Sequence, residues 1–129
     1  MKTIKFIAYL FYKYYSTGAT KSIPYFSTIC ALVMILILHF FQILILFNCM
    51  YLLPTVHATP GMPRFIKYLE TALITSPLFL FFFLLIKKNE LQSMQYDKSK
   101  TKRGYIYLII YIVLSFSFLV FLLLLKKRN

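Results

Sequence analysis

Residues 24–53 decide the fold, and they read PYFSTICALVMILILHFFQILILFNCMYLL. No charged residue lies between Lys21 and Arg64, so this stretch belongs to the longest uncharged part of the chain. Pro24 suits the first turn of a helix, where its missing N–H is not needed, and Pro54 ends the run. A bilayer core about 30 Å thick needs roughly 20 helical residues to cross it. We therefore predict one membrane-spanning helix over 24–53, which must tilt or protrude at one end.

Two further uncharged stretches predict two more spans. The first is short, so we expect its helix to begin next to Pro63 and to cover residues 65–86. Pro77 falls inside this span and predicts a kink there. The second stretch, residues 105–125, is an uninterrupted apolar run. Residues 23–129 are thus expected to form a three-span membrane domain.

The composition supports the same class of protein. The chain has 129 residues, of which 60% are hydrophobic and 14% charged. Average soluble proteins have roughly 45–50% and 25%, respectively. A soluble domain of this size could not bury so much apolar surface. These values exclude an ordinary soluble enzyme, a disordered tail and a disulfide-stapled secreted module, and they predict an all-α integral membrane protein.

The charge is strongly basic, with 15 Lys and Arg against 3 Asp and Glu and a net charge of +12. In a soluble chain this excess would suggest nucleic acid as the partner. Here the bases cluster beside the apolar stretches, where they meet anionic lipid headgroups and set the topology. We therefore expect the lipid bilayer, and no nucleic acid, as a partner. The bases expected at the headgroups are Lys2, Lys5, Lys13, Lys87, Lys88 and Arg103.

Residues 1–22 have a pattern of their own. At 100° per residue, the apolar side chains fall on one side of a helix, and Tyr9 falls on the other side with Lys2, Lys5 and Lys13. This predicts a short basic amphipathic helix that lies in the membrane interface instead of crossing it. A cleaved signal peptide is the alternative, but Lys13 interrupts an already short apolar run.

The distribution of bases also predicts the topology. Three spans place the N-terminal segment and the second loop on one side of the membrane, with ten bases, and the first loop and the tail on the other, with five. The positive-inside rule puts the ten bases in the cytoplasm. The N-terminus is then cytoplasmic and the C-terminus outside, although the tail carries Lys126, Lys127 and Arg128.

His39 and Gln42 are the candidate functional residues within the spans. They lie three residues apart on one face of the first span. Polar groups in a membrane helix either hydrogen-bond a neighbouring helix or line a water-filled path. We expect both side chains to face another helix, in this chain or in a partner, and a pore-lining role is the alternative.

No arrangement of residues points to catalysis. The sequence has no HExxH, P-loop, GxSxG or paired-carboxylate motif. Its His, Cys and acidic residues offer no close ligand spacing, so no catalytic, cofactor-binding or metal-binding residue is assigned and no cofactor is expected. We expect a protein that is not an enzyme; a membrane enzyme acting on lipids would need interfacial groups that are largely missing here.

The segment from Tyr9 to Ser27 is rich in Tyr, Phe and Lys and leads through Ile23-Pro24-Tyr25 into the first span. It resembles uncharacterised small multi-span membrane proteins of Bacteroidota. The resemblance implies a location in a bacterial inner membrane and no activity. We expect a small non-catalytic membrane protein that acts through protein contacts, as an accessory subunit or an immunity-type protein. The alternative is a self-associating pore or holin-like protein.

Overall fold

The computed structural model describes residues 2–49, 61 and 63–128, and nearly all of them are helical. The element order is α1 (Lys2–Thr17), α2 (Pro24–Leu46), α3 (Arg64–Leu85), α4 (Lys88–Ser93) and α5 (Lys98–Arg128). No strand occurs among these described residues. The expected all-α class is therefore confirmed.

Three of the helices are long and apolar enough to cross a membrane. Their mean hydropathies are 2.8 for α2, 1.8 for α3 and 3.0 for α5. The value for α3 is lowest because even its most apolar 18-residue window contains Glu70 and several other polar residues, together with Pro77. The chain is thus a multi-pass membrane protein with three candidate spans, and an N-terminal helix precedes them.

The first span is shorter than predicted, because α2 ends at Leu46 and residues 50–53 lie outside the described residues. Asn48 adopts a left-handed conformation with φ 55°, which stops the helix. The N–H of Asn48 donates to the carbonyl of Ile45, and the N–H of Cys49 donates to that of Leu44. This pair of bonds is a Schellman motif. At 23 residues, about 35 Å, α2 matches the bilayer without a long protrusion.

Helix α5 extends beyond the predicted span of residues 105–125, because it begins at Lys98 and ends at Arg128. Both the N–H and the hydroxyl of Thr101 donate to the carbonyl of Asp97, which closes the first turn. The bases at the start of α5, assigned above to a loop, therefore lie on helical turns. Their long side chains can reach the headgroups from there. The short helix α4 was also not predicted from the sequence.

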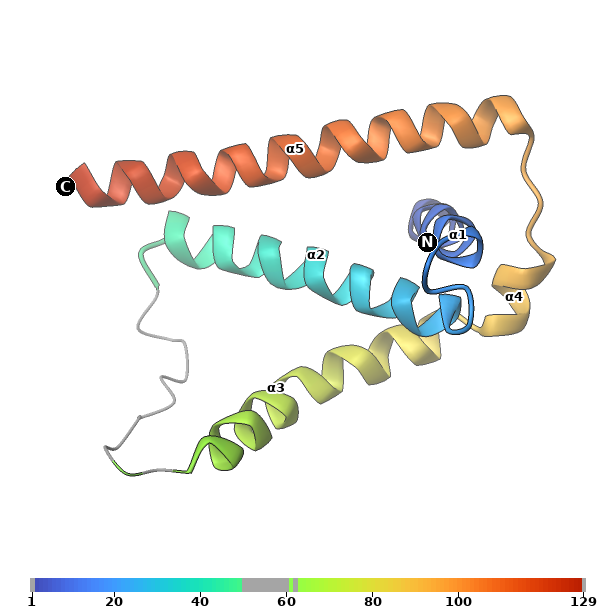
Figure 1. Ribbon diagram of the computed structural model, residues 1–129. Helices are drawn as coiled ribbons and strands as arrows, with labels where there is room; N and C mark the ends of the chain where they lie inside the picture. Colours follow the sequence, from blue (N-terminus) through green and yellow to red (C-terminus); the bar gives the residue numbers. More distant parts are fainter. Residues whose placement is uncertain (1, 50–60, 62, 129) are drawn as a thin grey trace.

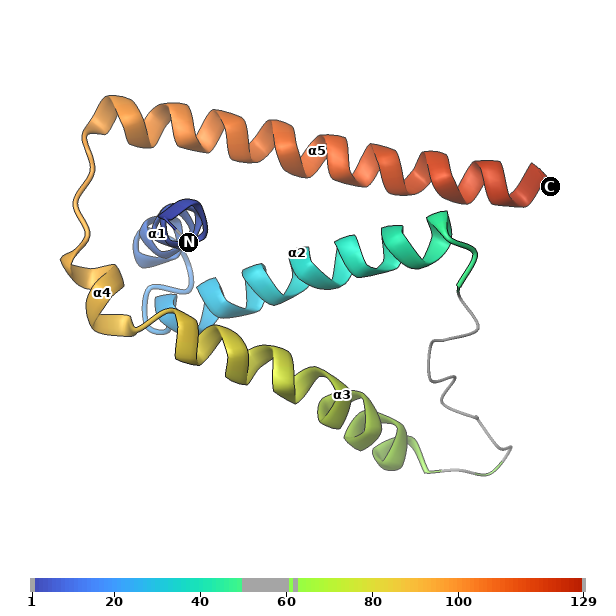
Figure 2. The same ribbon diagram turned by 180° about the vertical axis from the view of Figure 1, so that it is seen from behind.

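The second span agrees with its prediction, since α3 covers Arg64–Leu85 and follows Pro63 directly. The helix runs through Pro77. Figures 1 and 2 show α3 beside α2 at the C-terminal end of α3 and diverging from it toward its own N-terminal end.

Helix α1 packs between two spans and does not lie outside them. Figure 1 shows it nearly end-on between α2 and α5, at the end of the molecule that also holds α4 and the start of α5. Ala8, Tyr9 and Leu10 are its buried residues, and they pack in one cluster with Ile29 and Val33 of α2.

Tyr9 lies on the same side of α1 as Lys13, as the helical wheel predicts, but this position is buried: Tyr9 is only 7% exposed. Its ring lies 5.0 Å from that of Tyr96 in an edge-to-face arrangement, and Lys13 Nζ lies 6.0 Å from its centre. An aromatic side chain can hold a lysine stem over its face while its body is buried, so a residue that shares a face with lysines is not necessarily exposed.

Candidate functional site

His39 is held between its own helix and α5. Its Nδ1 lies 2.8 Å from the carbonyl oxygen of Ile35, so this nitrogen carries the proton and donates. Its Nε2 is then the acceptor for the hydroxyl of Tyr111, at 2.6 Å. The two rings stack with centroids 5.6 Å apart and planes 9° apart. One bond therefore fixes the tautomer, and the other ties α2 to α5.

Gln42 makes the second polar link between the same helices. Its side chain is 7% exposed, and its Nε2 donates to the backbone carbonyl of Ser115 at 2.7 Å. A helical carbonyl has two lone pairs, so Ser115 can accept this bond in addition to the one within α5. The structure thus places both predicted residues against another helix of the same chain.

The partners on α5 share one face of that helix. Tyr111 and Ser115 are four residues apart, and His39 and Gln42 are three apart, so both pairs project from neighbouring turns. The sequence pattern indicated His39 and Gln42 on one side of this contact but not Tyr111 on the other. Its position inside the third span, away from the interfaces that tyrosines favour, was the available signal.

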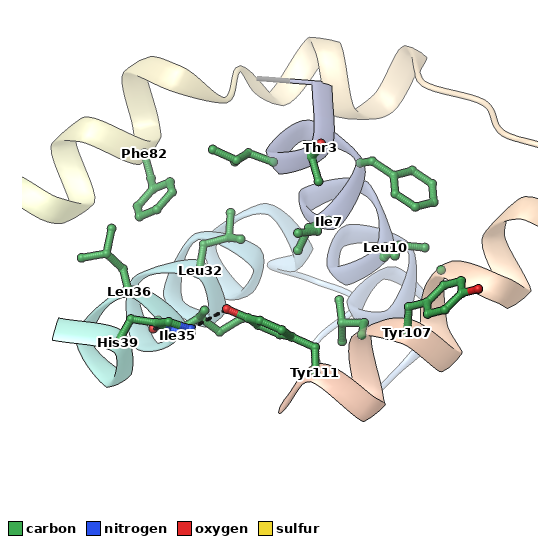
Figure 3. Close-up of a pocket in the computed structure, with 14 residues that line it drawn as sticks. Thr3, Ile7, Leu10, Leu32, Ile35, Leu36, His39, Phe82, Tyr107 and Tyr111 are labelled. Atoms are coloured by element: carbon green, nitrogen blue, oxygen red, sulfur yellow. Dashed lines mark hydrogen bonds between the residues drawn. The ribbon is translucent and has the colours of Figure 1, made fainter. Parts of the chain in front are cut away.

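Two apolar cavities flank the His39–Tyr111 bond, and both of these side chains line each of them. Each has a volume of about 630 Å³. The first is a half-open cavity lined by α1, α2 and α5, with Phe82 of α3 at one side. Figure 3 shows the His39–Tyr111 bond along one edge of this cavity and Thr3 at the opposite edge.

Gly104 is a contact residue that the sequence analysis missed. It is buried in α5, and a Cβ built on it would lie 2.8 Å from Cζ of Phe6 and 2.9 Å from Cδ1 of Leu10. Nearby, the hydroxyl of Tyr105 donates to the carbonyl of Leu10 at 2.9 Å. The absence of a side chain at position 104 thus lets α1 lie directly against α5.

The bases expected at lipid headgroups all lie on, or next to, α1, α4 and the start of α5. Among them, Lys5 has a protein partner, because its Nζ donates to Oε2 of Glu90 at 2.9 Å. Both side chains are partly exposed, so this ion pair contributes little to stability but links α1 to α4.

No cluster of three His, Cys, Asp or Glu side chains that could hold a metal ion occurs among the described residues. Both cysteines, Cys30 and Cys49, are free thiols. No family model, curated protein or solved structure matches the chain.

Proposed function

We propose that this chain is a small non-catalytic protein of the bacterial inner membrane that acts by binding another membrane protein, as an accessory subunit or an immunity-type protein. The observation that carries the proposal is the N-terminal half of α3, which has no residue in the buried cluster formed by the part of the chain that the structure describes. The contacts of α3 with the buried cluster come from its second half, at Leu78, Phe79, Phe82 and Leu85. In the first half, large apolar side chains such as Phe65, Leu69 and Leu73 are exposed.

Pro77 adds a reason for a partner helix at this surface. Because proline has no N–H, the carbonyl of Leu73 lacks its usual donor four residues later. A carbonyl that has lost this donor is costly in hydrocarbon unless another group or a local change in the helix replaces it, and Leu73 itself is 67% exposed. A polar side chain on a neighbouring helix could satisfy that carbonyl, whereas lipid tails could not.

The alternative of a pore is less well supported by the site. A pore formed by His39 and Gln42 needs both side chains to face water. Instead, Gln42 is buried against α5, and both nitrogens of His39 have partners within the chain. These residues therefore support internal packing of the spans and leave partner binding to α3.

A photo-crosslinking amino acid at position 73 tests the proposed function in native membranes. We expect one adduct of defined mass with a different protein. Leu124 of α5 is the matched control, because it is 62% exposed and also lies in a span. The control position should give lipid adducts only. Lipid adducts alone at position 73 would overturn the proposal. Adducts between copies of this chain at both positions would favour a self-associating pore.

We further propose that the N-terminus is cytoplasmic and the C-terminus outside. Figure 2 shows α1, α4 and the start of α5 gathered at one end of the molecule. This end carries the N-terminal lysines and the dense basic cluster around Lys87–Arg103, and the positive-inside rule assigns such an end to the cytoplasm.

Cysteine labelling tests this orientation in a chain whose two native cysteines are replaced by serine. An impermeant maleimide applied to intact cells should label Thr59→Cys but neither Ser93→Cys nor Ser99→Cys. All three should react after the cells are opened, which controls for buried positions. Labelling at position 93 in intact cells would show that the second loop lies outside, and it would contradict the proposed orientation.

A further inference from the structure

The half-open cavity lined by α1, α2 and α5 is suited to a hydrocarbon chain. Its walls are mainly aliphatic and aromatic, including Ile7, Leu10, Leu32, Leu36 and Leu108. Its volume of about 630 Å³ falls within the roughly 300–1,000 Å³ of pockets that hold small molecules. The few polar groups at its edge, such as His39 and Tyr111, are bonded to each other. A polar ligand would therefore find few free partners inside.

The chemistry changes where this cavity meets the start of α5. A second hollow, of about 450 Å³, shares Phe6, Gly104 and Tyr107 with the apolar cavity. Its remaining lining is polar and consists of Asp97, Ser99, Lys100 and Arg103. A third hollow shares Phe6 and Lys100 with the second and adds Lys2 and Lys5. The apolar cavity, called the chamber below, thus adjoins a polar region, called the mouth below, that is lined by four bases and one acid; the contact between Phe6 and Gly104 lies where the two meet.

Lys100 is held in place at this mouth. Its Nζ lies 4.9 Å from the centre of the Tyr96 ring and 5.6 Å from that of Phe6. These cation–π contacts orient the ammonium group without neutralising its charge. Lys5, in contrast, is paired with Glu90. Arg103 lies one turn along α5 from Lys100, so the two cations can act on one anion.

The order of the two compartments matches the depth profile of a membrane. The bases occupy the first turns of α5, and the apolar run of that helix starts directly after Gly104. The mouth therefore lies at the level of the headgroups, and the chamber lies at the level of the upper acyl chains. The N-terminus of α5 adds a partial positive charge at the mouth.

We propose that this site binds an anionic glycerophospholipid, with its phosphate at Lys100 and Arg103 and one acyl chain in the cavity between α1, α2 and α5. Basic pockets between membrane helices recognise such headgroups. A free phosphate would leave the apolar chamber empty. A zwitterionic lipid would bring an extra cation next to Lys100 and Arg103, and an apolar partner helix would leave both bases without an anion.

A single tryptophan provides the test, because the native chain contains none. The variant Tyr107→Trp places the reporter on a residue that lines both the chamber and the mouth. The protein is reconstituted in phosphatidylcholine vesicles that contain brominated phosphatidylglycerol or, at the same mole fraction, brominated phosphatidylcholine. Bromine quenches tryptophan at short range, so the comparison reports which lipid occupies the site. Leu124→Trp reports the bulk lipid around α5.

We expect brominated phosphatidylglycerol to quench the reporter at position 107 at least about fivefold more effectively than brominated phosphatidylcholine, since each base near the surface is worth about that factor. The reporter at position 124 should show no preference. Lys100→Gln with Arg103→Gln should abolish the preference at 107. Lys126→Gln with Lys127→Gln removes the same charge from the opposite end of α5 and should keep it.

Three results would overturn the proposal. Equal quenching by both lipids would mean that the mouth does not select an anion. Displacement of the anionic lipid by millimolar inorganic phosphate would assign the site to a free anion. No quenching by either lipid would mean that no acyl chain enters. Native mass spectrometry of the unaltered protein gives an independent reading, because it should retain phosphatidylglycerol in preference to phosphatidylcholine; equal retention would also contradict the proposal.

Discussion

Replacing Gly104 with leucine is expected to separate α1 from α5 and to lower the free energy of unfolding by about 1–3 kcal/mol, the usual cost of overpacking a filled contact. Even the first carbon of a new side chain would lie within 3 Å of Phe6 and Leu10. The larger leucine side chain cannot be accommodated by a small movement of these two. The bond from Tyr105 to the carbonyl of Leu10 should break at the same time.

Amide hydrogen exchange in lipid nanodiscs measures this effect. The amides of α1 should exchange faster in the Gly104→Leu variant, while those of α3 stay unchanged. Ser117→Leu is the matched control, because it adds the same side chain to an exposed position of α5. Gly104→Ala should have a small net effect, because the gain in helix propensity offsets a clash with the flexible ends of two side chains. Unchanged exchange in the leucine variant would contradict the packing of α1 against α5.

The spans could be predicted because charges are expensive inside a bilayer. The two longest uncharged stretches contain α2 and most of α5, whereas the shorter stretch between Glu70 and Lys87 becomes a candidate span only with the charged turns that begin α3. The ends of these helices depend on other effects. Asn48 stops α2 through a local backbone motif, and Asp97 starts α5 within a basic segment, so charge patterning alone misplaced both ends.

The interior contacts were harder to predict, because they depend on which helices become neighbours. A helical wheel treats α1 as an isolated helix at the membrane surface, with its apolar face in the lipid and its polar face toward the headgroups. In the fold α1 has protein on several sides, so Tyr9 is buried and Gly104 becomes important only because α5 lies next to it. His39 and Gln42 stood out as polar residues in a span, but nothing in the sequence identified Tyr111 and Ser115 as their partners.

Replacing His39 and Gln42 together with leucine should weaken the contact between α2 and α5. Interhelical hydrogen bonds in membranes average about 0.6 kcal/mol and rarely exceed about 1.7. Two such bonds predict a loss of about 1 kcal/mol, which reversible unfolding in mixed micelles can detect. The Gln42 change should account for the smaller part of this loss of stability, because the Ser115 carbonyl keeps its partner within α5. The His39 change leaves the Tyr111 hydroxyl without an acceptor.

A double-mutant cycle of His39→Leu and Tyr111→Phe isolates the hydrogen bond between His39 and Tyr111. If the hydroxyl of Tyr111 binds His39 as described, the combined variant should lose less stability than the sum of the two single changes. Ion flux through liposomes then separates packing from conduction. We expect no flux from the native chain or from the His39→Leu, Gln42→Leu variant, because these side chains are used within the chain. Ion flux that requires His39 would mean that the contact between α2 and α5 opens to water. It would then favour a pore over the proposed role in binding a partner protein.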